Sequence, residues 1–223
     1  MKSTPQINKI IDLLQNEYGV RPWQPHHDPV SELVQTILSQ NTSDKNSRPA
    51  FRELTRTFPL WEDILKAKPE EIAEPIKSGG LAKIKALRIQ QALQEIKNRL
   101  GKIELDILID MPLSQAKIWL KTLPGVGDKT AACVLLFALG RPALPVDTHV
   151  FRVSKRLGLL AANSTLDKAH IILEELVAPE LIYQFHVTII DQGRKICSAQ
   201  RPACSKCILK SVCPSNGLFT KGH

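Results

Sequence analysis

The amino-acid sequence predicts an all-α protein. Apolar residues recur at spacings of three and four over most of the 223 residues, as they do on one face of an α-helix. Alternation of apolar and polar residues with a period of two never persists long enough to build a sheet. The connections between the periodic segments are short, as is usual in helical domains.

Start and stop residues divide the chain into individual helices. Thr4-Pro5 and Gly19 bracket the first, whose apolar residues run from Ile7 to Tyr18. Asp28-Pro29 is a helix start signal, and Gly101 is a stop signal for a long helix over about 84–100. The other helices are expected over about 43–58 (with Pro49 inside), 114–123, 128–139, 147–157, 166–177 and 179–190.

Composition narrows the class of protein. Thirty Lys and Arg against 22 Asp and Glu give a net charge of +8, and the isoelectric point is about 9.3. This excess favours a polyanionic partner, most commonly nucleic acid. Segment 185–223 has six basic residues and one acidic residue. There is no apolar run long enough for a bilayer and no signal peptide, so we expect a cytoplasmic, nucleoid-associated protein without membrane contact.

Four of the five cysteines lie in the last 27 residues. A secreted disulfide framework would spread its cysteines and leave no odd one, such as Cys133. Four thiolates on a short loop-rich segment are typical of tetrahedral zinc or of an iron–sulfur cluster. The residue types leave both metals open. The four are separated by six, two and five residues: Cys197, Cys204, Cys207 and Cys213.

A turn with two glycines joins two of the expected helices, over Leu123-Pro124-Gly125-Val126-Gly127. Glycine permits unusual backbone conformations and lets a ligand approach the main chain. The amides of this turn lie beside the N-terminus of the next helix, which attracts anions. We expect Gly125, Val126 and Gly127 to contact a DNA phosphate without regard to base sequence. An ordinary corner between two helices is the alternative.

Lys129 and Asp147 follow this turn at the starts of two successive helices. A lysine at a helix N-terminus opposes the dipole, and desolvation with the dipole disfavours its ammonium form, which frees a nucleophilic amine. A lysine that reaches solvent or contacts a phosphate is the alternative. Asp147 has the position of an N-cap, which would hold its carboxylate rigidly at a helix entrance.

At these residues the sequence resembles the endonuclease III family of DNA glycosylases, in the helix-hairpin-helix superfamily. The resemblance covers about residues 28–213 and rests on Leu123–Ala131, on Val146–Val153 and on the cysteine cluster. It implies a bifunctional DNA glycosylase and abasic-site (AP) lyase of base excision repair. The lysine that matches Lys129 attacks the sugar in that family, and the aspartate that matches Asp147 assists.

The resemblance also implies two helical domains. One is a six-helix domain over 28–141 that contains the hairpin, and the other combines 1–27 with 142–223 and the cysteines. Lys129 and Asp147 would face each other across the cleft between these domains. The cysteine spacing matches the family's loop for a [4Fe-4S] cluster, so iron–sulfur is favoured over zinc. The cluster would be structural and would present Arg201 to the DNA backbone.

Three residues are candidates for insertion into DNA by the same resemblance. A polar side chain after residue 38 fills the space left by a flipped-out base, and here Gln40 and Asn41 are adjacent. The family usually has Gln at the position of Asn41. Leu81, after Gly79-Gly80, matches the residue that wedges into the opposite strand, although core packing would also suit a leucine.

The mechanism implied begins with flipping of the damaged nucleotide out of the duplex. Lys129 would displace the base at C1′ and form an imine, which permits β-elimination of the 3′ phosphate. Asp147 would stabilise positive charge on the sugar. Oxidised pyrimidines in double-stranded DNA, or abasic sites, are the expected substrates, and the protein is expected to be a monomer. Mismatched or deaminated pyrimidines are an alternative substrate class.

Other functions are less well supported by the residues present. Mismatch-specific adenine glycosylases have a catalytic carboxylate where this chain has Gln35, and they generally lack the lysine. A non-catalytic iron–sulfur DNA-binding protein would not need both Lys129 and Asp147. A zinc-ribbon binding module is distinguished by metal analysis.

Overall fold

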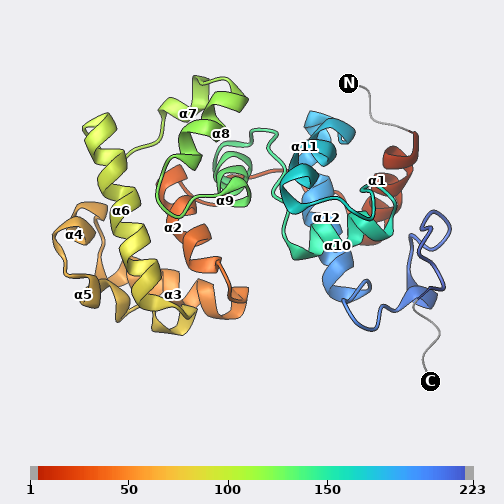
Figure 1. Ribbon diagram of the computed structural model, residues 1–223, viewed down its shortest axis with the longest axis horizontal. Coiled ribbons are helices and arrows are strands. Elements are labelled where there is room, and N and C mark those ends of the chain that lie inside the picture. Colours follow the sequence, from red (N-terminus) through yellow and green to blue (C-terminus); the bar gives the residue numbers. More distant parts are fainter. Residues whose placement is uncertain (1–4, 219–223) are drawn as a thin grey trace. The chain divides into compact units, whose positions relative to one another are not determined.

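The computed structural model describes residues 5–218 and confirms the all-α prediction, since these residues contain no strand (Figure 1). No helix among them is both long and apolar enough to cross a membrane. The α-helices are α1 (Pro5–Tyr18), α2 (Pro29–Ser39), α3 (Asp44–Thr57), α4 (Trp61–Lys66), α5 (Pro69–Ala73), α6 (Ala82–Leu100), α7 (Ile107–Asp110), α8 (Leu113–Lys121), α9 (Asp128–Cys133), α10 (Thr148–Arg156), α11 (Leu166–Leu176) and α12 (Ile182–Lys195). Short turns are η1 (Lys77–Gly79), η2 (Val134–Ala138), η3 (Pro179–Leu181) and η4 (Cys204–Lys206).

The chain divides into two compact units. One comprises Pro25–Arg141, and the other combines the chain up to Gln24 with the chain from Pro142 onward. The second unit is therefore assembled from both ends of the chain, as the red and blue ends of the ribbon in Figure 1 show.

Helix α2 is the centre of the unit 25–141, where it packs against α3, α6, α9 and η2. Leu33, Ile37 and Leu38 are fully buried, and each such side chain contributes about 1.5–3 kcal/mol to folding. The helix begins as its start signal predicts, because the Asp28 carboxylate accepts hydrogen bonds from the backbone N–H groups of Val30 and Ser31, both at 3.0 Å.

Helix α6 ends where Gly101 predicts, in a left-handed residue with φ of 75°. The face of α6 that is buried is not the face on which its apolar residues predict burial. Ile84 and Leu87 are 48% and 43% exposed, whereas Lys85 is 1% exposed. The expected helix over 128–139 changes from α to π geometry at Val134, a local change that often occurs at functional sites.

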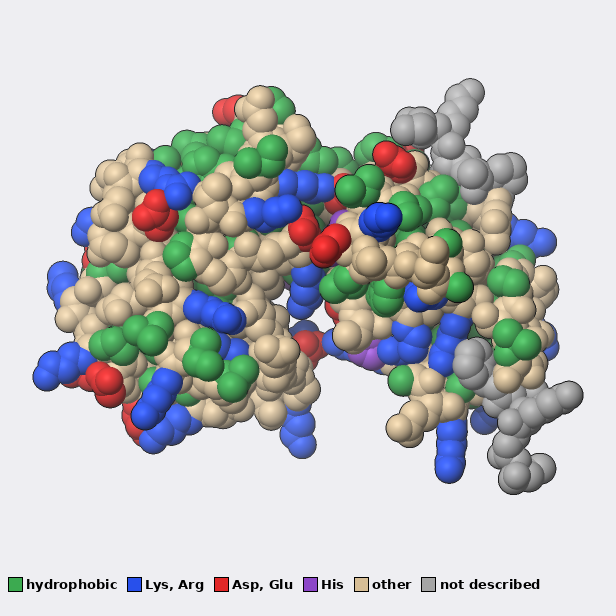
Figure 2. Space-filling view, in the orientation of Figure 1, with side chains coloured by type: hydrophobic (Ala, Val, Ile, Leu, Met, Phe, Trp, Pro, Cys, Tyr) green, Lys and Arg blue, Asp and Glu red, His purple; other side chains and the backbone are tan. Residues whose placement is uncertain are grey.

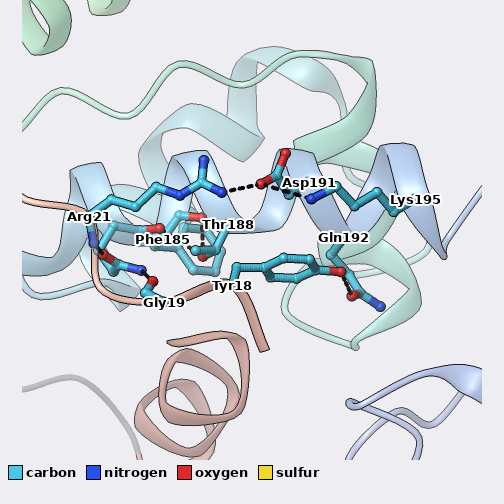
Figure 3. Close-up of polar contacts among 9 residues, drawn as sticks. Tyr18, Gly19, Arg21, Phe185, Thr188, Asp191, Gln192 and Lys195 are labelled. Carbon is cyan, nitrogen blue, oxygen red and sulfur yellow. Dashed lines mark hydrogen bonds and ion pairs between the residues drawn. The ribbon is translucent and has the colours of Figure 1, made fainter. Parts of the chain in front are cut away.

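Polar contacts join the N-terminal segment to α12 in the second unit (Figure 3). Tyr18 donates its hydroxyl to Gln192 Oε1 at 2.7 Å, and Arg21 pairs with Asp191 at 2.7 Å. The Gln184 side chain accepts from the Arg21 backbone N–H at 2.7 Å and donates to the Gly19 carbonyl at 3.0 Å. Because α12 leads directly to the cysteine segment, these contacts also anchor that segment to the helices.

Candidate active site

The turn between α8 and α9 holds Gly125 in a left-handed conformation. Its φ is +78°, and a Cβ there would lie 2.9 Å from Cδ of Arg88, so conformation and packing both require glycine. Gly127 is different, because its φ is −102° and a Cβ there would meet nothing within 4 Å. Gly127 therefore leaves open space at the N-terminus of α9, where a ligand can approach the backbone.

The side-chain amide of Gln40 ties the loop after α2 to this hairpin. Its Nε2 donates to the carbonyl oxygen of Gly125 at 2.9 Å and to Thr130 Oγ1 at 3.3 Å. Its Oε1 accepts a hydrogen bond from Arg88 at 3.1 Å. Gln40 is thus engaged inside the protein and fixes the position of the hairpin.

Lys129 lies in the first turn of α9 and is half-exposed, whereas the four residues after it are buried. Its neighbour Asp128 forms an ion pair with Lys121, with 2.7 Å between Nζ and Oδ1. That pair offsets the negative charge of Asp128 beside the hairpin. Lys129 therefore presents an amine at the edge of a buried helix, next to backbone N–H groups that can bind an anion.

Sequence reasoning did not single out a carboxyl near this lysine. Glu32, on α2, is 4% exposed and its Oε1 accepts a hydrogen bond from Thr36 at 3.4 Å. Burial raises the pKa of Glu32 to about 7, against the opposing effects of the Thr36 hydrogen bond and of the Lys129 charge. In the sequence, Glu32 resembles an ordinary acidic residue in the first turn of a helix, so nothing there indicates burial.

Asp147 belongs to the unit that contains α10. It is the N-cap of that helix, as its position predicts, and its Oδ1 accepts a hydrogen bond from the Val150 backbone N–H at 2.8 Å. The side chain is half-buried. The cap fixes the carboxylate, and its second oxygen can interact with another group.

Asn41 and Leu81 share an unusual backbone conformation. Among the described residues they are the two non-glycine positions with positive φ, at 53° and 52°. Asn tolerates this region, but for leucine it costs about 1–2 kcal/mol. Both side chains are exposed, and Leu81 has 51% of its surface accessible. Such strain in exposed residues is typical of functional positions.

Lys85 connects the two loops that carry these residues. Its buried ammonium group donates to the carbonyl of Leu38 at 2.7 Å and to that of Gly79 at 2.8 Å. Burial lowers the pKa of Lys85. Charge-assisted hydrogen bonds of this kind are about twice as strong as neutral ones. Lys85 therefore links the end of α2, shortly before Asn41, to η1, shortly before Leu81.

The four C-terminal cysteines line one small cavity of about 30 Å³. Arg156 donates to the sulfur of Cys197 at 3.2 Å, and Gln192 donates to that of Cys207 at 3.0 Å. Burial raises the pKa of the Cys207 thiol, and its neighbouring cysteines add to the effect. Among the described residues no three potential ligands are grouped closely enough for a single metal ion. Four thiols around one cavity form a donor set that both an iron–sulfur cluster and a zinc ion can take.

Basic side chains are scattered over both units on the face that Figure 2 shows, and acidic side chains are fewer there. In the cysteine segment Arg201 is exposed, as expected, and so are Lys206 and Lys210. The unit 25–141 also has an open hollow of about 650 Å³ lined by His26, His27, Gln35, Arg48, Phe51 and Arg52. These surfaces can contact phosphates.

Comparison with known proteins identifies relatives over most of the chain. Residues 34–179 match the family described as "HhH-GPD superfamily base excision DNA repair protein". An endonuclease III of Thermotoga maritima is 36% identical over 186 residues, which is 83% of each chain. A protein of Arabidopsis thaliana provisionally named a DNA glycosylase is 39% identical over 166 residues, and the match spans 74% of this chain and 56% of that relative.

Two further similarities extend over most or all of the chain. A solved structure described as a non-covalent endonuclease III–DNA complex is 28% identical, with a TM-score of 0.85 and full coverage of both chains. A thymine-DNA glycosylase of Aeropyrum pernix is 30% identical over 198 residues, which is 86% of this chain and 85% of that one.

Proposed function

Since the chain belongs to the HhH-GPD superfamily of base excision DNA repair proteins, we propose that it is a bifunctional DNA glycosylase and AP lyase. It removes damaged pyrimidines and then cleaves the strand at the resulting abasic site. The observation that carries this proposal is Lys129, a half-exposed amine in the first turn of α9, directly after a hairpin suited to a DNA phosphate.

Lys129 is the proposed nucleophile. Its amine attacks C1′ of the flipped nucleotide, the base leaves with the electron pair of the glycosidic bond, and the opened sugar remains bound as an imine. The protonated imine withdraws electrons, so a C2′ proton becomes acidic and the 3′ phosphate leaves by β-elimination. Asp147 stabilises positive charge on the sugar, from the rigid position that the N-cap gives it. That these two residues face one active site is inferred from the family.

The duplex is held by backbone contacts and by inserted side chains. The N–H groups of Gly125 and Gly127 bind a phosphate, and Arg201 binds another. The expected contact from Val126 is not supported, because its N–H donates to the Leu123 carbonyl at 3.2 Å and the residue is buried. Asn41 fills the space left by the flipped base and Leu81 wedges into the opposite strand, which their exposure and left-handed conformations support. Gln40 has a different role, because its amide already holds the hairpin.

Substitutions of Asn41 and of Gln40 distinguish the inserted side chain from the one that holds the hairpin. We expect Asn41→Gly, which removes the side chain and keeps the positive φ without strain, to slow base excision from duplex DNA about tenfold. The reason is that the flipped-out state loses its contact with the Asn41 side chain, which is worth about 1–2 kcal/mol. Cleavage of an abasic site in single-stranded DNA, which needs no flipping, should change little.

Gln40→Ala should slow both reactions, because it releases Arg88 and the Gly125 carbonyl. Asn98→Ala, an exposed asparagine late in α6, is the control and should alter neither. Single-turnover rates on the two substrates are the measurement. Equal losses for Asn41→Gly on duplex and single-stranded DNA would contradict the role of Asn41.

A [4Fe-4S] cluster is the proposed cofactor, held by Cys197, Cys204, Cys207 and Cys213. Their common cavity supports the assignment, as do the donors that Arg156 and Gln192 direct at two of the sulfurs. When bound, the cluster cross-links a segment with little regular structure. Its ligands then hold Arg201 and its basic neighbours in position on the DNA side of that segment.

Metal analysis tests this cofactor. The purified protein should be yellow-brown and contain iron and acid-labile sulfide. Cys204→Ser should lower iron content and DNA affinity, since metal binding is coupled to folding of the segment. Cys133→Ala is the matched control, because Cys133 is buried in the other unit, and it should keep its iron. A colourless, active preparation with stoichiometric zinc would overturn the assignment.

Oxidised or ring-saturated pyrimidines are the proposed substrates, since they stack poorly and cost less to flip. Asn41 is shorter than Gln, so excision should be slower than cleavage of an abasic site. The similarity to a thymine-DNA glycosylase makes mismatched pyrimidines the second candidate.

A panel of duplexes in one sequence context distinguishes the two substrate classes. We expect single-turnover rates to decrease from an abasic site to thymine glycol, and then to uracil and a G·T mismatch. Faster removal of mismatched thymine or uracil than of thymine glycol would replace the first candidate by the second. Absence of strand cleavage at the abasic site would reject the lyase activity itself.

A further inference from the structure

Glu32 is a buried carboxyl on the helix that packs against the helix of Lys129. Its side chain is 4% exposed, and its Oε2 has no hydrogen-bond partner among the described residues. A buried polar atom without a partner costs free energy. Glu32 therefore occupies a position where an apolar residue would stabilise the fold more.

Two charged groups act on this carboxyl. Asp28, at the N-cap of the same helix, opposes its ionisation, and Lys129, on α9, favours it. Of the other described elements that pack against α2, α3 and α6 contribute no comparable effect from their charged groups, and η2 carries no charged side chain.

The same carboxyl lowers the stability of the protein above neutral pH. Burial, the largest cause, raises the pKa of Glu32 from 4.5 to about 7. A carboxyl whose pKa is raised in the folded state contributes stability that is present below pH 4.5 and is lost as the pH rises through about 7. Buried ionisable residues that lower stability in this way occur preferentially at functional sites.

We propose that Glu32 is the proton acceptor for Lys129. This inference rests on the proposed function, because it requires Lys129 to react as a neutral amine. One proton moves from the ammonium group to a Glu32 oxygen, which leaves an amine and a carboxylic acid. At an abasic site the amine adds to the C1′ aldehyde, the N–C1′ bond forms, and water leaves. Glu32 then returns the proton to the imine nitrogen, which gives an iminium ion.

The transfer requires a movement of the lysine side chain. Glu32 Oε2 is not hydrogen-bonded to Lys129 in the structure. Lys129 is half-exposed on a flexible four-carbon stem, so rotation can change the position of its amine. Catalytic hydrogen bonds are often absent without substrate and form in the complex.

Glu32→Gln tests the proposal, because glutamine keeps the shape and cannot ionise. The rate of borohydride-trapped adduct formation at pH 7 should fall at least tenfold, and the inflection of the pH profile near 7 should disappear. The melting temperature at pH 8 should rise, whereas a purely structural role predicts a fall. An unchanged or faster rate, or a retained inflection, would overturn the proposal.

Thr36→Val is the second variant and leaves the carboxyl in place. It removes the hydrogen bond that lowers the pKa of Glu32, so the inflection should move to higher pH. An inflection that stays in place would show that another group titrates there.

A measurement without substrate tests the coupling between Glu32 and Lys129 independently of the proposed function. The pKa of Glu32, followed by NMR in the intact protein, should rise in Lys129→Ala because a favourable positive charge is lost. If the pKa does not rise, the coupling is refuted even in an active enzyme. If it rises but the wild-type protein forms no adduct, the proposed function fails and the coupling stands.

Discussion

We expect Lys129→Ala to abolish the covalent adduct that borohydride would trap between this protein and abasic-site DNA. The reductant captures an imine, and the imine needs the Lys129 amine. Removal of a nucleophile typically lowers turnover by a factor on the order of 10⁴ or more. Binding should persist, because the hairpin and the basic surfaces remain. Stability should hold or rise by about 0.3–1 kcal/mol, since a cation at a helix N-terminus opposes the dipole.

Gel analysis of trapped adducts, together with a binding measurement on the same DNA, checks this expectation. Lys121→Ala is the matched control, because Lys121 lies at the end of α8 and pairs with Asp128. It should keep the adduct. An undiminished adduct in Lys129→Ala would mean that another residue is the nucleophile. Loss of both DNA binding and the adduct would mean that Lys129 acts as a DNA contact.

Asp147→Asn should slow turnover by a factor of roughly 10²–10⁴, as expected when a charged group that stabilises the transition state is neutralised. Asparagine caps helices about as well as aspartate, so the free energy of unfolding should change by no more than about 1 kcal/mol. Affinity for damaged DNA should be equal or higher, because a negative charge is removed.

Asp147→Ala separates catalysis from capping. Alanine removes both the charge and the acceptor for the Val150 N–H, so it should cost about 1 kcal/mol more stability than asparagine. If turnover follows stability, with normal rates for Asn and reduced rates for Ala, Asp147 is a helix cap alone. Single-turnover rates and denaturant unfolding curves supply the two measurements.

Long helices were predictable because their apolar residues repeat over several turns. The start of α2 follows from Asp28, and the end of α6 follows from Gly101. The short helices α4, α5 and α7 were not predicted, since four to six residues give too little periodicity for recognition. The π-helical turn after Cys133 depends on tertiary packing, which the apolar run over 131–139 does not specify.

The candidate site could be assigned from the sequence only where its residues belong to local motifs. Lys129, Asp147 and the four cysteines stand at motif positions, whereas Glu32 and Lys85 do not. Lys85 has the sequence context of an exposed helix lysine, yet it is buried against two carbonyl groups. The proposed difference in role between Gln40 and Asn41 also rests on the structure, because side-chain hydrogen bonds and backbone φ distinguish the two residues.

The account depends most on the identity of the nucleophile, and peptide mapping of the trapped complex tests this directly. The reduced adduct with abasic-site DNA is digested with nuclease and protease, and the peptide that carries the sugar remnant is sequenced by mass spectrometry. We predict modification at Lys129, in the peptide that begins α9. Modification at another amine, such as Lys121, with Lys129 unmodified, would contradict the account.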